Sequence, residues 1–216
     1  MTIHQLDKQD SILNNFISQL RAKNIQKDAM RFRRNIERIG EISAYKLSKQ
    51  LLYKQEKIST PLGEKEINLI NENLVLCSIL RAGLPLHQGL LNYFDDVENA
   101  YISAYRKHTA KNDFEIVVEY FASPSLENKT LILADPMLAT GNSLVAVYHA
   151  LLKHGKPKKI HIVSVIGATE GIDFIKKHFP ENTELWIATV DDKLDEKGYI
   201  IPGLGDAGDL AFGEKL

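Results

Sequence analysis

A single stretch of the sequence combines the residue types needed to bind a sugar phosphate. In residues 131–143, LILADPMLATGNS, an apolar run ends at the carboxylate Asp135 and leads into a turn of small residues. The turn at 140–143 offers hydroxyls, a glycine that lets the backbone approach a ligand closely, and the N–H groups of a helix start, which attract phosphate. Because like charges repel, Asp135 suits the sugar hydroxyls rather than the phosphate. The alternative is an Asp turn followed by a helix N-cap at Asn142 or Ser143.

Arginines follow two other apolar runs and could hold phosphate oxygens. Arg81 lies in SILRAGLP, residues 78–85, where a guanidinium offers two parallel donors to a phosphate and Gly83 permits close backbone approach. Arg106 and Lys107 follow a third apolar run, in the sequence YRKH. The alternative for Arg81 is a surface arginine paired with an acid.

The C-terminal segment 199–213, YIIPGLGDAGDLAFG, could present many backbone groups to a ligand. It contains four glycines and one proline among acidic residues, which is also the composition of a flexible tail. Its aromatic and apolar residues favour an ordered, packed loop instead: Tyr199, Ile200, Ile201, Leu204 and Phe212.

These segments need a scaffold that brings them together, and the rest of the sequence indicates one. Short apolar runs, typical of strands buried on both faces, occupy residues 74–80, 100–105, 130–134, 160–166 and 185–190. Helical patterns lie between several of them, at residues 84–92, 143–153 and 171–178. This alternation predicts an α/β fold with a parallel sheet covered by helices on both faces. Ligands of such sheets bind at the carboxyl ends of the strands, where Asp135, Arg81 and Arg106 lie.

Two flanking segments depart from this alternation. Residues from about 28 to 54 carry apolar side chains at near-helical spacing and predict a long amphipathic helix. Residues 114–121, FEIVVEYF, alternate loosely, so with the preceding strand they predict an antiparallel hairpin or arm projecting from the sheet. The helix holds a basic cluster that could bind nucleic acid, although interspersed acids and amides favour a solvated or subunit-facing side: Arg31, Arg33, Arg34 and Arg38.

Length and composition exclude several classes of protein. The chain has 216 residues, 44% hydrophobic and 25% charged, which are ordinary values for a globular protein of one large domain or two small ones. Its net charge of -1 argues against a general polyanion binder. No apolar run reaches membrane-spanning length, and the polar N-terminus does not resemble a signal peptide. The single cysteine, Cys77, permits no internal disulfide and fits a reducing cytoplasm; we interpret it as a small buried strand residue rather than a nucleophile.

Together, three of these stretches resemble the uracil phosphoribosyltransferases, within the type I phosphoribosyltransferase group. ILRAGL, DPMLATG and GYIIPGLGDAGD are similar to that family's diagnostic stretches and occur in the family's order, and the resemblance extends from about residue 20 to the end. Pro136 stands where most type I relatives carry a second acid, which favours the uracil enzymes over the purine and orotate ones. The resemblance implies a type I phosphoribosyltransferase-like parallel sheet in a single domain, residues 1–216, with an N-terminal helical segment (about 1–55), a β-arm (about 106–122) and a base-binding loop (about 198–213).

The resemblance also implies a reaction and its residues. The family transfers the phosphoribosyl group from 5-phospho-α-ribose 1-diphosphate to uracil, giving UMP and diphosphate in pyrimidine salvage, with Mg²⁺ as cofactor. By resemblance, the catalytic residues are Asp135, Arg106 and Asp206. The phosphoribosyl diphosphate site would comprise Arg81, Arg106, Asp135, Pro136, Met137, Leu138, Ala139, Thr140, Gly141, Asn142, Ser143 and Asp206. The uracil site would comprise Ile200, Gly205, Asp206 and Ala207, and no metal site made by the protein alone is implied.

This sequence departs from the family pattern at two places. Asn142 stands where many members have a second glycine. After Arg106 the family often continues with acidic residues, whereas Lys107, His108 and Thr109 follow here, so we assign no catalytic role to the arm beyond Arg106. The other histidines show no ligand spacing, which argues against a protein-held zinc site.

Two alternative functions stay open at this point. One is a nucleotide-sensing, RNA-binding regulator on the same fold, which would need the basic face at residues 31–38. The other is a phosphoribosyltransferase for a different base. We expect no membrane or nucleic-acid partner, and a homodimer or higher homo-oligomer, because the arm and the basic helix need partners. GTP is a candidate allosteric activator, as in some relatives.

Overall fold

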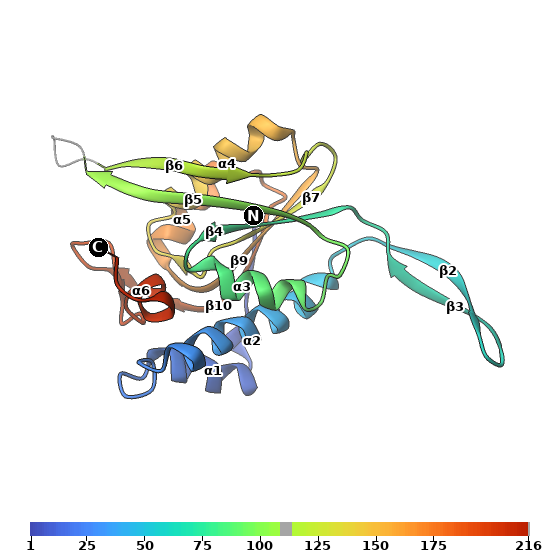
Figure 1. Ribbon diagram of the computed structural model, residues 1–216, viewed down its shortest axis with the longest axis horizontal. Coiled ribbons are helices and arrows are strands. Elements are labelled where there is room, and N and C mark those ends of the chain that lie inside the picture. Colours follow the sequence, from blue (N-terminus) through green and yellow to red (C-terminus); the bar gives the residue numbers. More distant parts are fainter. Residues whose placement is uncertain (109–113, 216) are drawn as a thin grey trace.

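A central sheet of mostly parallel strands organises the molecule (Figure 1). The computed structural model describes residues 1–108 and 114–215, and of residues 104–108 and 114–119 it describes the backbone alone. The strand order is β1-β10-β9-β7-β4-β5-β6, and all neighbours are parallel except β5 and β6. The strands are β1 (Thr2–Gln5), β4 (Leu74–Leu80), β5 (Glu98–His108), β6 (Phe114–Ala122), β7 (Thr130–Ala134), β9 (Lys159–Ala168) and β10 (Glu184–Asp191), with the short β8 (Met137–Leu138) also pairing with β9.

Helices cover both faces of this sheet, as the sequence predicts. One apolar core joins the sheet to α1 (Ile12–Arg21), α2 (Ala29–Ser48), α3 (Gly83–Leu91) and α6 (Ala207–Phe212). A second core, on the other face, joins it to α4 (Asn142–Leu151) and α5 (Thr169–His178). Two 3-10 turns, η1 (Leu6–Lys8) and η2 (Leu152–His154), complete the helical elements of the described chain. No helix in residues 1–108 or 114–215 is long and apolar enough to cross a bilayer.

The predicted strands appear where the apolar runs lie. The bounds of β4 and β7 match the predicted runs at 74–80 and 130–134, because these central strands are buried on both faces. The other three predicted strands are one to three residues longer at their ends in the structure. The predicted antiparallel arm is formed by β5 and β6, whose pairing runs from Tyr101 opposite Ala122 to His108 opposite Phe114.

The N-terminal segment, about 1–55, differs from the helical prediction in two ways. It opens with the strand β1, which adds to the edge of β10, and the long helix ends at Ser48 rather than near residue 54. From Tyr53 the chain forms a hairpin of β2 (Tyr53–Thr60) and β3 (Gly63–Ile70), which projects away from the sheet (Figure 1). Both strands are exposed along their whole length, and the apolar residues that share one face of the hairpin are too few to mark either strand in the sequence.

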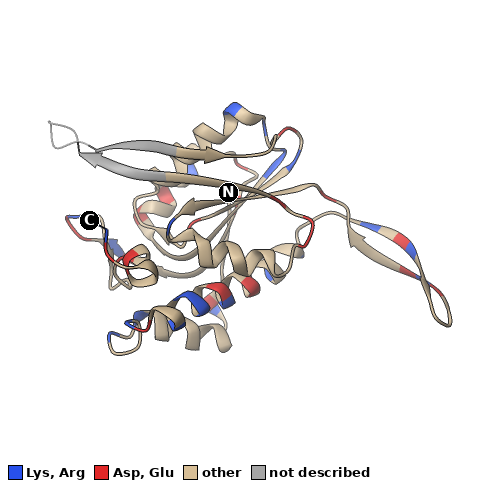
Figure 2. Cartoon of the chain, viewed as in Figure 1, with Lys and Arg blue, Asp and Glu red and all other residues tan. Residues whose placement is uncertain are grey.

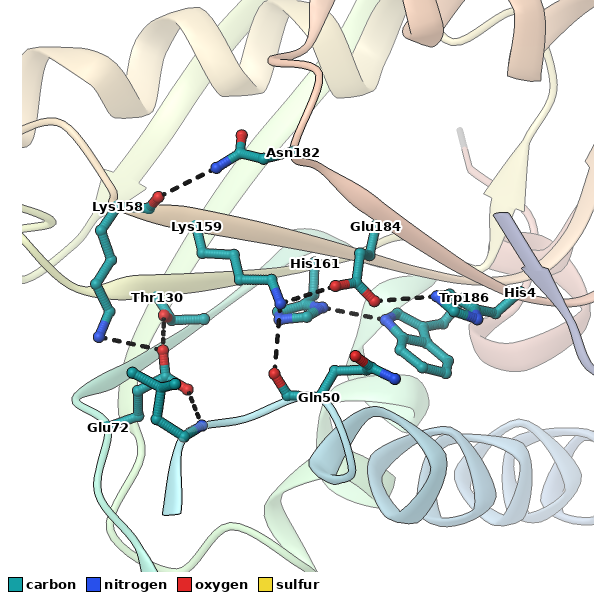
Figure 3. A network of polar contacts seen from close by, with 11 residues as sticks. His4, Gln50, Glu72, Thr130, Lys158, Lys159, His161, Asn182, Glu184 and Trp186 are labelled. Atoms are coloured by element: carbon teal, nitrogen blue, oxygen red, sulfur yellow. Dashed lines mark hydrogen bonds and ion pairs between the residues drawn. The ribbon is translucent and has the colours of Figure 1, made fainter. Parts of the chain in front are cut away.

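A network of polar contacts lies at the amino ends of the strands, at the edge of the sheet opposite the predicted site (Figure 3). His4 on β1 stacks on Trp186 at 3.8 Å between ring centroids and bonds to Glu184. Lys159 pairs with Glu184 at 2.7 Å and also donates to the carbonyl of Gln50, after α2. The network therefore joins the edge strand and the long helix to β9 and β10.

Candidate active site

The ends of three adjacent strands bring the predicted residues to one edge of the sheet. β4 lies between β7 and β5, with Ser78 opposite Ala134 and Leu80 opposite Ser103. Asp135 and Arg81 therefore follow neighbouring parallel strands, and both lie at the carboxyl edge, where α/β sheets bind ligands. The C-terminal loop and α6 lie beside the same edge (Figure 1).

The turn after β7 forms a small pocket around a left-handed glycine. Gly141 has a φ of +80°, and a Cβ atom there would lie 2.9 Å from Ile175 and 3.1 Å from the carbonyl oxygen of Gly171. Gly141 is also the N-cap of α4 and has no side chain to cap the helix, while the Thr140 hydroxyl oxygen accepts from the Asn142 N–H at 3.4 Å. The alternative of Asn142 or Ser143 as the capping residue is therefore wrong. The pocket is lined by Asp135, Met137, Ala139, Thr140, Gly141, Ser143 and Leu144.

Asp135 lines this pocket and is buried. Its backbone N–H donates to Val163 O, and its Oδ1 accepts a hydrogen bond from Met137 N–H at 3.2 Å. Ser164 donates its hydroxyl to the Asp135 carbonyl. Burial raises the pKa of Asp135 to about 7, against the opposing effect of the Met137 N–H. The group is thus poised between its neutral and charged forms near neutral pH.

Arg81 connects the strand-end loop to the C-terminal helix. Its Nη2 donates to Asp209 Oδ1 at 3.0 Å and to the carbonyl of Gly213 at 3.1 Å. The arginine is paired with an acid, as the alternative interpretation supposed, yet the pair lies beside the site rather than on a remote surface. The Arg81 side chain is 39% exposed, so other anions can reach it.

The C-terminal segment is an ordered loop, so the alternative of a flexible tail is wrong. Its short strand β12 (Ile200–Ile201) pairs with β11 (Lys193–Leu194), which precedes the segment, and α6 lies near its end. Ile200, Leu204 and Ala207 are buried in the core shared with the N-terminal helices. Asp206 caps α6 by accepting a hydrogen bond from the backbone of Asp209 at 2.9 Å. A second pocket beside this loop is lined by Gln26, Leu204, Gly205, Asp206, Asp209, Leu210 and Glu214.

For Arg106, the structure describes the backbone alone. The backbone of Arg106 lies on β5 opposite Ile116, but the side chains of Arg106, Lys107 and His108 lie outside the described part of the chain, as does the whole of Thr109.

Cys77 is buried in β4, and burial raises the pKa of its thiol to about 12. This confirms its interpretation as a packed strand residue rather than a nucleophile.

The basic cluster on α2 is occupied by contacts within the chain. Arg31 pairs with Asp28, Arg34 with Glu37, and Arg38 with the side chain of Asn35. Figure 2 shows basic and acidic residues alternating along this helix. The fourth member of the cluster, Arg33, donates to the Ala211 carbonyl in α6 at 2.7 Å.

The contact of Arg33 is one of several hydrogen bonds between the N-terminal helical segment and the C-terminal loop, which the sequence pattern does not indicate. Arg21, at the end of α1, contacts Asp191 and Gly203, and Gln26 donates to the carbonyl of Leu204. These partners are about 170 to 180 residues apart in sequence, so no local spacing indicates them.

Comparison with known proteins places this arrangement in a family. The sequence model of the family described as uracil phosphoribosyltransferase matches residues 8–214. Proteins named uracil phosphoribosyltransferase from two strains of Porphyromonas gingivalis are 51% identical over 216 residues, covering 100% of this chain and of each relative. The chain belongs to the uracil phosphoribosyltransferase family. Its predicted family membership is therefore confirmed.

Solved structures agree with the uracil phosphoribosyltransferase assignment at the level of fold. A solved Aquifex aeolicus protein is 31% identical, with a TM-score of 0.87 over 98% of both chains. A hypoxanthine phosphoribosyltransferase from Staphylococcus aureus superposes with a TM-score of 0.51 at 16% identity, over 78% of this chain and 83% of that one. The second likeness shows the fold alone. The predicted type I phosphoribosyltransferase fold is confirmed.

Proposed function

We propose that the strand-end pocket and the C-terminal loop together carry out the family's reaction. The protein is a transferase that moves the 5-phosphoribosyl group from 5-phospho-α-ribose 1-diphosphate to uracil, giving UMP and diphosphate in pyrimidine salvage. The observation that carries the assignment of the site is the buried Asp135 in a pocket opened by the left-handed Gly141, beside an ordered loop that contains Ile200.

The proposed phosphoribosyl site is the turn from Asp135 to Ser143. Backbone N–H groups at the start of α4 and the hydroxyls of Thr140 and Ser143 suit the 5-phosphate, since an α-helix start attracts anions. Asp135 accepts hydrogen bonds from the ribose hydroxyls. A charged carboxylate strengthens such bonds, and binding the substrate favours the ionised form of a group whose pKa burial has raised.

The proposed diphosphate site uses Arg81 and Arg106. Breaking the bond between C1 and the diphosphate leaves negative charge on the leaving group, which guanidinium groups stabilise. The described residues contain no group of three or more His, Cys, Asp or Glu that could hold a metal ion. Asp135 and Asp206 are the carboxylates that would contact a Mg²⁺ brought by the diphosphate, and such an ion would neutralise leaving-group charge.

The proposed uracil site uses backbone groups of the C-terminal loop, at Ile200, Gly205, Asp206 and Ala207. The Ile200 carbonyl would accept from uracil N3–H, and the N–H of Ala207 or a neighbour would donate to O4. Cytosine reverses both of these groups, and a backbone N–H cannot become an acceptor. Sites of this kind discriminate by about 10⁴ or more when buried groups are left unpaired.

A panel of bases tests the proposal. Initial rates with labelled phosphoribosyl diphosphate should show turnover of uracil and of the small analogue 5-fluorouracil, and rejection of cytosine, hypoxanthine and guanine. Comparable rates with cytosine, or a preference for hypoxanthine, would contradict the assignment of the loop. Filter binding to RNA provides the matched test of the regulator hypothesis, which the paired arginines of α2 do not favour.

We also propose that the protein works as a homodimer or higher homo-oligomer through the hairpin β2–β3. An isolated two-stranded hairpin is marginally stable in water, so this one needs a partner surface. Ile58, Ile67 and Leu69 share one face of it, by the register that places them opposite Lys65, Glu56 and Lys54. Apolar residues flanked by both signs of charge suit the same face of a second copy.

Two further expectations concern the setting of the enzyme. The single cysteine is buried and makes no disulfide, which supports a cytoplasmic location. Activation by GTP stays a prediction, and initial rates with and without GTP at subsaturating phosphoribosyl diphosphate test it.

A further inference from the structure

One largely buried ion pair fastens the base-binding loop to the N-terminal helices. The guanidinium of Arg21, the last residue of α1, contacts both carboxylate oxygens of Asp191 at the end of β10, at 2.7 and 2.8 Å. It also donates to Thr189 Oγ1 at 3.3 Å. The Asp191 side chain is 8% exposed. Burial opposes its charged form, but hydrogen bonds from Arg21 and the Gly203 N–H outweigh burial and hold the pKa of Asp191 below its usual value.

Both members of the pair hold the peptide groups of Gly203. The Gly203 N–H donates to Asp191 Oδ2 at 2.8 Å, and Arg21 Nη1 donates to the Gly203 carbonyl at 3.2 Å. Charge-assisted bonds on both sides of one residue restrict the rotation of its peptide planes. Gln26 adds an attachment at the next residue, where its amide donates to the carbonyl of Leu204 at 3.0 Å. The loop is therefore fixed where the chain turns after β12.

The turn at Gly203 brings its backbone close to the Ile200 carbonyl. Gly203 has a φ of +59°, and a Cβ atom added there would lie 2.1 Å from the Ile200 carbonyl oxygen. The carbonyl is thus packed directly against the Cα of Gly203, and a rotation of the Gly203 peptide would displace it. Ile200 is the residue proposed above as the acceptor for uracil N3–H.

We propose that Arg21 and Asp191 are positioning residues for uracil, which fix the Ile200 carbonyl through the peptide groups of Gly203. The proposal rests on the proposed uracil site in the loop and adds two residues that act on the base through Gly203. Neither residue lines the pocket around Asp135. Loss of the pair therefore weakens base recognition more than the binding of phosphoribosyl diphosphate, most of whose proposed contacts lie in the turn from Asp135 to Ser143.

Steady-state kinetics of Arg21→Lys and Asp191→Asn test this, with uracil and phosphoribosyl diphosphate varied separately. Arg21→Lys keeps the charge and loses the planar fork, while Asp191→Asn keeps the shape and loses the charge. We expect the KM for uracil to rise about tenfold in each variant, with kcat and the other KM within about twofold, and the preference for uracil over cytosine to fall. Arg34→Ala is the matched control, because Arg34 also pairs with acids, Glu37 and Glu41, and among the described residues both of these ion pairs stay within α2.

The outcomes separate this inference from the proposed function. An unchanged KM for uracil in both variants, or an equal rise in both KM values, would overturn the positioning role while leaving the reaction in place. Loss of cooperative thermal unfolding in both variants would overturn it as well, because the pair would then be a general stability element. A wild-type protein that does not turn over uracil would overturn the proposed function together with this inference.

Discussion

Asp135 shows how one buried carboxyl group can oppose stability while serving the reaction. Its ordinary pKa is near 3.9, and burial raises it to about 7 in the folded protein. The folded state therefore binds the proton more tightly than the unfolded chain. The stability that this provides is complete below about pH 4 and is lost as the pH rises to about 7.

Asp135→Asn should therefore stabilise the ligand-free protein at alkaline pH. At pH 8 the wild type carries a buried charge that the amide does not, and the free energy of unfolding should rise by at most about 4 kcal/mol. At pH 4 the two proteins should be nearly equal. Urea titrations at both pH values measure the difference. An equal effect at pH 4 and pH 8 would show that the carboxyl group does not titrate as its burial implies.

The same substitution should lower activity. The amide still reaches the ribose hydroxyls but loses charge assistance, which is worth roughly 1–2 kcal/mol, or about 5- to 30-fold. The measurement is the rate at subsaturating phosphoribosyl diphosphate. If Asp135→Asn is more stable at pH 8 but has wild-type kinetics, Asp135 does not take part in substrate binding.

At the scale of elements, the turn between β7 and α4 depends on one glycine. Gly141→Ala would place a Cβ in a left-handed backbone and against Ile175, so we expect a loss of stability of about 1–3 kcal/mol and weaker binding of phosphoribosyl diphosphate. Gly63→Ala is the matched control, because Gly63 also has positive φ, but no atom lies within 4 Å of its added Cβ. Equal effects on substrate affinity in both variants would argue against the shape of the cradle as the cause.

The loop after β4 and helix α6 are coupled through Arg81 and Asp209. If Arg81 holds the diphosphate, Arg81→Ala should weaken the binding of free diphosphate about tenfold or more, since the pair of phosphate contacts is lost. Asp209→Asn should instead tighten it a few-fold, because it removes the carboxylate that competes for Arg81 at 3.0 Å. Calorimetric titration with diphosphate measures both changes. Shifts of the same sign would contradict competition between the two anions.

At the scale of the whole molecule, the projecting hairpin should set the oligomeric state. Placing lysines at Ile67 and Leu69 should lower the molar mass measured by light scattering, because two buried charges would face the second copy. Asn68→Lys is the matched control, since Asn68 lies between them on the opposite face of β3. An unchanged mass in the double variant would show that this face is not the contact.

The sequence predicts strands that carry a local apolar pattern, but it does not predict exposed strands or contacts between residues far apart in the chain. Continuous apolar runs mark β4 and β7 because both faces of these strands are buried. The hairpin β2–β3 escapes detection because neither of its faces is buried, and the four-residue β1 has no apolar run of its own. In the candidate site, the ends of the predicted strands mark Asp135 and Arg81 as candidates, and the family resemblance adds Ile200; their roles stay predictions. The Arg21–Asp191 pair is 170 residues apart, and only the folded chain shows it.

The pairing of β1 with β10 also constrains the order in which the chain can assemble during synthesis. Thr2 lies opposite Glu184, and Gln5 lies opposite Ile187. A ribosome adding about 5–20 residues per second needs on the order of ten seconds or more to reach those partners. Throughout that time β1 lacks the strand it pairs with, and Arg21 lacks its partner Asp191. Strand β1 must therefore wait until residues 184–187 are made before this edge of the sheet can close.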